Sequence, residues 1–108
     1  MNNDIIKQGK STAIVSYILF IGPLIALSMN SENKNTFASF HIRQGLGITV
    51  TFIILGVSIS YFNNFMIASS MWIFISVLAV YGIFTAARGV TRPLPILGPI
   101  FQKLFQNI

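Results

Sequence analysis

Two long stretches of this 108-residue chain contain no charged side chain, one from Ser11 to Ser31 and the other from Gln44 to Ala87. Soluble helices alternate apolar and polar faces every three to four residues. These stretches are apolar on all sides, which is typical of helices surrounded by lipid or by one another. Charged residues make up 8% of the chain, against roughly 25% in soluble proteins. The sequence therefore predicts one all-α membrane domain, residues 1–108, in a lipid bilayer.

Three transmembrane helices are predicted, over about residues 12–29, 45–62 and 65–87, because each run approaches the roughly 20 residues that cross a hydrocarbon core of about 30 Å. The second helix is expected to begin near Thr36, and its first two turns are amphipathic and suited to the membrane surface. Asn63-Asn64 is a short turn signal. The second and third helices should therefore form an antiparallel hairpin.

The first predicted span contains Gly22-Pro23, and a kink is expected there because Pro23 has no N–H to donate within the helix. The same run also has features of a signal peptide. Lys7 and Lys10 precede it, and Ala26-Leu27-Ser28 has the small-x-small pattern of a cleavage site. We interpret the run as a retained span.

After the third span the chain changes character at Arg92, Pro93, Leu94 and Pro95. Prolines two residues apart remove two backbone donors and favour extended geometry in the residues before them. Residues 96–106 then form a short amphipathic segment, which is predicted to lie in the membrane interface. Its apolar residues recur three to four apart: Ile96, Leu97, Ile100, Phe101, Leu104 and Phe105.

The chain offers little for catalysis. Its only carboxylates are Asp4 and Glu32, its only histidine is His41, and it has no cysteine. General acid–base chemistry needs a positioned pair, and a metal site needs three or four ligands. We predict no enzymatic activity, no metal and no cofactor. The net charge of +5 comes from basic residues at the ends of apolar runs, where they meet lipid phosphates, so nucleic-acid binding is not expected.

The densest polar cluster at a membrane boundary comprises Phe40, His41, Arg43, Gln44 and Gly45. In one interpretation Arg43 reaches lipid headgroups, His41 lies in wet interface and Gln44 caps a neighbouring helix. In the other interpretation, the cluster binds a partner or acts as a gate, because polar groups in membrane helices are costly and tend to point inward. The sequence leaves both open.

Small residues mark the expected helix contacts, because helices in lipid associate where small side chains let their backbones approach closely. Packing within the chain is the first interpretation, and contact with another subunit is the alternative. The residues are Gly22, Ala26, Thr49, Gly56, Ser76, Ala79, Gly82 and Ala86.

These elements together resemble the small bacterial relatives of the Tic-twenty family, a membrane component of the chloroplast inner-envelope import translocon. The resemblance runs from about Ser11 onward. It is carried by the Gly-Pro of the first span, by Phe40-His41-Ile42-Arg43-Gln44-Gly45, and by the closing motif Pro93-Leu94-Pro95-Ile96-Leu97-Gly98. It implies a role in protein transport and a bacterial cytoplasmic membrane.

Three functions follow as hypotheses. The first is a non-enzymatic subunit or accessory factor of the protein translocation or insertion machinery, with a protein partner in the membrane. The second is a homo-oligomer that conducts a small solute or an ion. The third is a structural membrane protein with no transport role.

Three spans would place the N-terminus and the Asn63-Asn64 turn on one side of the membrane. The other side would carry five of the seven basic residues, against two, Lys7 and Lys10, at the N-terminus. The positive-inside bias then predicts the N-terminus outside and the C-terminus inside.

Overall fold

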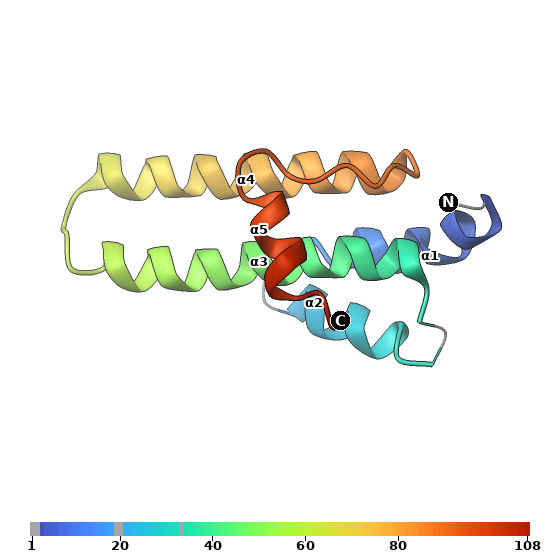
Figure 1. The fold of residues 1–108 in the computed structure, drawn as a ribbon. Helices are drawn as coiled ribbons and strands as arrows, with labels where there is room; N and C mark the ends of the chain where they lie inside the picture. Colours follow the sequence, from blue (N-terminus) through green and yellow to red (C-terminus); the bar gives the residue numbers. More distant parts are fainter. Residues whose placement is uncertain (1–2, 19–20, 33) are drawn as a thin grey trace.

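The computed structural model describes residues 3–18, 21–32 and 34–108, and five α-helices account for most of them (Figure 1). They are α1 (Asn3–Val15), α2 (Ile21–Met29), α3 (Thr36–Ile59), α4 (Phe65–Ala87) and α5 (Gly98–Leu104). α3 and α4 run side by side in opposite directions. α1 and α2 lie along the half of α3 nearest its N-terminus, and α5 crosses α3 near its middle.

The α3–α4 hairpin agrees with the sequence prediction. Each helix begins after an asparagine whose side chain caps it: Asn35 accepts a hydrogen bond from the amide of Ala38, and Asn64 accepts from the amides of Met66 and Ile67. Such caps satisfy amides that have no partner within the helix. With 24 and 23 residues, both helices are long and apolar enough to cross a membrane.

The prediction differs from the structure over residues 12–29, where two shorter helices replace the expected single span. α1 ends at Val15 and α2 begins at Ile21. Pro23 lies in the first turn of α2, where a missing N–H costs nothing because such amides have no intrahelical partner. The proline is therefore part of a helix start, not the centre of a kink. At 13 and 9 residues, α1 and α2 are each too short to cross a bilayer, which takes about 20. A third spanning helix is not found in the part of the chain described.

α1 and α2 form a helical hairpin that opens toward one end of α3–α4. Ile6 near the start of α1 lies against Gly89, just after α4, where an added Cβ would sit 2.9 Å from the Ile6 side chain. The far end of the hairpin reaches Gly45, nine residues into α3, where the carbonyl of Ser16 leaves no room for a Cβ. α2 then returns along α3, and Asn30, the residue after α2, donates to the Ser39 hydroxyl at 3.0 Å. The start of α1, the residues around Asn30 and Asn35, and the end of α4 thus share one end of the molecule.

α5 lies within the predicted interfacial segment 96–106 and rests on α3 through Phe101. The Phe101 ring occupies the space that a side chain at Gly47 would fill. Ile96, Ile100 and Leu104, four residues apart, remain exposed. One apolar edge of this segment is therefore open to the surroundings, as an interfacial helix requires.

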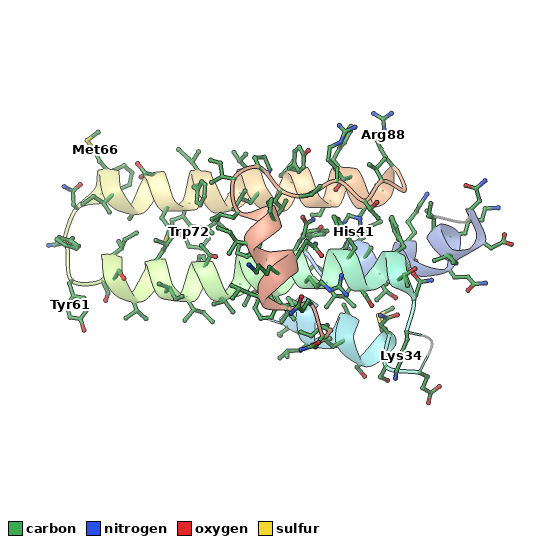
Figure 2. All side chains as sticks on the ribbon, in the orientation of Figure 1. Lys34, His41, Tyr61, Met66, Trp72 and Arg88 are labelled. Atoms are coloured by element: carbon green, nitrogen blue, oxygen red, sulfur yellow. The ribbon has the colours of Figure 1, made fainter. Side chains whose placement is uncertain are left out.

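In the half of the molecule that contains the three short helices, α2 packs with α3 in a small cluster, and α1, α3, α4 and α5 contribute to the main core. Phe37, Ile48, Ile75 and Leu78 are its large, almost fully buried members. The opposite half consists of α3 and α4 alone and exposes a dense set of large apolar side chains: Ile53, Ile54, Val57, Tyr61, Phe62, Phe65, Met66, Trp72, Ile73 and Val77. Figure 2 shows Tyr61 and Met66 at this end, and Lys34 and Arg88 toward the other.

Candidate functional site

A chain of buried hydrogen bonds joins the turn that follows α1, helix α3 and the segment after α4. The Leu94 amide donates to Gln44 Oε1 at 2.7 Å, and Gln44 Nε2 donates to the Tyr17 hydroxyl at 2.7 Å. Tyr17 in turn donates to His41 Nδ1, and His41 Nε2 donates to the Val90 carbonyl at 2.9 Å. The Leu94 amide can only donate and the Val90 carbonyl can only accept, so the bonds at the two ends have a fixed direction. A neutral imidazole that donates from Nε2 accepts at Nδ1, and the Tyr17 hydroxyl then donates to it. This direction requires the neutral imidazole with its proton on Nε2.

Local sequence explains how the side chains meet. His41 and Gln44 are three residues apart and share one face of α3, and both are fully buried. Glycines make room for the turn after α1: the Ser16 carbonyl packs against Gly45, and the Tyr17 ring packs against Gly82 of α4. The Ser16 hydroxyl also donates to the His41 carbonyl at 3.0 Å.

The side chains of Gln44, Tyr17 and His41 in this hydrogen-bond chain all have their partners within the protein. Buried polar groups destabilise a protein when unpaired, but a fully paired network fixes one arrangement of its parts. The partners of His41 and Gln44 are Tyr17, in the turn after α1, and the backbone of Val90 and Leu94. The arrangement therefore holds three separate stretches of chain together.

Phe40 and Arg43 face a different neighbour. The Arg43 guanidinium donates to Gln102 Oε1 and to the Gln106 carbonyl, each at 3.3 Å, while Gln102 Nε2 donates to the Phe40 carbonyl at 2.9 Å. Arg43 Nε is buried and makes no hydrogen bond. The predicted cluster thus divides into an internal part, His41, Gln44 and Gly45, and a part that positions α5.

The C-terminal motif is organised around one buried side chain. Leu94 is 1% exposed, whereas Arg92, Pro93 and Pro95 are exposed. The chain then folds back so tightly that a Cβ on Gly98 would lie 2.8 Å from Pro93. Through the bond between Gln44 and the Leu94 amide, the two motifs that carry the family resemblance contact each other.

The predicted helix-packing residues fall into two groups. Gly22, Ala26, Gly82 and Ala86 are buried in contacts within the chain. Ala26 packs with Ala38 and Ile42 of α3. Thr49, Gly56 and Ala79 are half-buried and Ser76 is exposed; nothing lies within 4 Å of a Cβ built on Gly56.

Sequence reasoning missed Tyr17 and the asparagines that close the open end of the α1–α2 hairpin. Asn35 Nδ2 donates to the Ile5 carbonyl at 2.8 Å, and the Asn35 amide donates to Asn30 Oδ1 at 2.8 Å. The capping preference of asparagine before an apolar helix could have identified Asn35. For Tyr17, the only signal was a phenol within an apolar run.

The chemistry of the remaining side chains is sparse. No group of three or more His, Cys, Asp or Glu side chains that could hold a metal ion occurs within residues 3–18, 21–32 and 34–108. Comparisons with protein-family models, curated proteins and solved structures find no match to this chain.

Proposed function

We propose that this chain is an integral membrane protein in which α3 and α4 cross the bilayer and α1–α2 form a re-entrant hairpin in one leaflet. The exposed apolar surface supports this proposal. Ile53, Ile54 and Val57 on α3, together with Ile73 and Val77 on α4, are each about half exposed or more. Soluble monomers rarely expose apolar patches larger than a few hundred Å², but hydrocarbon chains solvate such side chains well.

Helix length sets the depth of the short hairpin. The part of α3 beyond Ile48 has 11 residues, which span only about 16 Å at 1.5 Å per residue. A hydrocarbon layer of about 30 Å therefore extends to roughly Phe40. The contact between Ser16 and Gly45 then lies inside the bilayer, so α1 and α2 dip into the leaflet. The exposed side chains of Ile21 and Leu24 on α2 are suited to contact lipid there.

Charge gives the orientation. With two crossings, all seven Lys and Arg residues precede or follow the charge-free run from Gln44 to Ala87 and belong to one side of the membrane. Under the positive-inside bias this side is cytoplasmic. The three-span prediction set the N-terminus opposite the end of α4, but the contact between Ile6 and Gly89 favours one side for both. We therefore propose that both termini are cytoplasmic.

For the activity, we propose a non-enzymatic accessory factor of protein translocation or insertion in a bacterial cytoplasmic membrane. The observation that carries this proposal is the hydrogen bond between Gln44 and the Leu94 amide. It joins the Phe40–Gly45 and Pro93–Gly98 motifs, which resemble those of the Tic-twenty relatives, into one structural unit. Two distant motifs that build a single unit are what a shared fold would require.

Photo-crosslinking in native membranes tests the activity. A crosslinking amino acid at exposed Ile54 or Val77 should capture a translocase, insertase or secretion component, whereas the same group at buried Ile75 should not. Capture of a second copy alone would contradict the proposal and favour the solute-conducting oligomer. Capture of no protein from either exposed position would favour the structural role.

A further inference from the structure

The outer face of α4 carries a trough that changes from apolar to basic along its length. Its apolar part is a groove lined by Ser76, Val77, Val80, Tyr81 and Phe84. These positions recur at helical spacing over eight residues, about 12 Å of helix. Phe84 also lines the next hollow toward the end of α4, so the two hollows adjoin at this residue.

The other end of the trough is rich in cations from three parts of the chain. The hollow beyond Phe84 is lined by Arg88 and by Arg92 of the following segment. Arg88 lines a further hollow with Lys7 and Lys10 of α1, and the carboxylate of Asp4 lies on the same wall. Four cations and one carboxylate thus line the two hollows at the end of α4.

Arg88 marks the boundary between the two chemistries. Its guanidinium carbon lies 5.4 Å from the centre of the Phe84 ring, so the cation sits directly beside the last aromatic side chain of the groove. Arg88 is also the first residue after α4. In the proposed membrane arrangement this is the level at which hydrocarbon gives way to headgroups.

We propose that this trough binds one anionic phospholipid, with an acyl chain in the groove from Ser76 to Phe84 and its phosphate between Arg88 and Arg92. Lys7 and Lys10 extend the positive field over the headgroup. Basic residues at the membrane surface attract anionic lipids, whereas a zwitterionic headgroup carries a cation that these four side chains repel. The inference rests on the proposed membrane location and adds a ligand to it.

Native mass spectrometry of the full chain tests the site. The protein is incubated in detergent with equal amounts of phosphatidylglycerol and phosphatidylcholine that carry the same acyl chains, and the detergent is then removed in the spectrometer. The wild-type protein should retain mainly one phosphatidylglycerol. Arg88→Gln and Arg92→Gln should each lower the ratio of retained phosphatidylglycerol to phosphatidylcholine by about fivefold. Lys34→Gln is the matched control, because it removes one positive charge from a different hollow, between α2 and the C-terminus.

Equal retention of both lipids by the wild-type protein would overturn the proposal without any variant. If Lys34→Gln and Arg88→Gln lowered the ratio of retained phosphatidylglycerol to phosphatidylcholine equally, the proposal would also be overturned. The net charge of the protein, and not the trough, would then determine the lipid preference. These outcomes are separable from failure of the membrane proposal. A chain that alkaline carbonate strips from membranes is not integral, whereas one that resists extraction but shows no lipid preference lacks only this site.

Discussion

Gln44→Leu tests whether the buried hydrogen-bond chain holds the fold together. Leucine is close to glutamine in size, but it leaves the buried Leu94 amide without an acceptor and removes the donor to the Tyr17 hydroxyl. An orphaned buried donor costs about 1–3 kcal/mol, and a lost hydrogen bond adds about 0.5–1.5 kcal/mol. Side-chain hydrogen bonds in membrane proteins average only about 0.6 kcal/mol, because the unfolded chain also finds partners. We therefore expect the free energy of unfolding to fall by about 2 kcal/mol.

The assay is reversible unfolding by SDS in mixed micelles, followed by circular dichroism. Thr49→Val on the same helix is the control, because the Thr49 hydroxyl is buried with no hydrogen-bond partner and valine keeps the shape. It should leave stability unchanged or raise it. If Gln44→Leu were as stable as the wild type, or if both substitutions destabilised the protein equally, the structural role assigned to the hydrogen-bond chain would be refuted.

Two glycine substitutions make further predictions. Gly82→Ala places a methyl group where the Tyr17 ring lies, and hydrogen bonds hold that ring in place. The substitution should destabilise the protein by about 1–3 kcal/mol in the same unfolding assay. Gly56→Ala, which has open space around it, should be neutral or stabilising by up to about 1 kcal/mol. Gly47→Ala displaces Phe101 and should release α5, which limited proteolysis of the C-terminus would detect, while an α5 as protected as in the wild type would contradict its docking on α3.

The long hairpin could be predicted from sequence because its signals are local. Residues Gln44 to Ala87 carry no charge, and Asn63-Asn64 interrupts this apolar run. The pattern therefore predicts two apolar helices joined by a turn. In the structure each helix begins directly after a capping asparagine. α4 matches the predicted range 65–87, and α3 begins at the expected Thr36.

The short hairpin could not be predicted in this way, because hydropathy cannot distinguish one long apolar helix from two short ones. What divides residues 12–29 is packing: the Val15 carbonyl occupies the space of a side chain at Gly22. The partners of the polar cluster could not be predicted for a related reason. Spacing placed His41 and Gln44 on one face of α3, but their partners, Tyr17 and Leu94, lie 24 and 50 residues away. No local pattern reports contacts at that separation.

The central claim is that α1 and α2 enter and leave the membrane from the same side, and a single cysteine at exposed Asn3 tests it most directly. The chain has no natural cysteine, so a membrane-impermeant thiol reagent reports only the introduced position. In intact bacterial cells, Asn63→Cys in the α3–α4 turn should be labelled. Asn3→Cys should be labelled only after the membrane is permeabilised. Labelling of Asn3→Cys in intact cells, together with Asn63→Cys, would place the N-terminus outside and contradict the re-entrant hairpin.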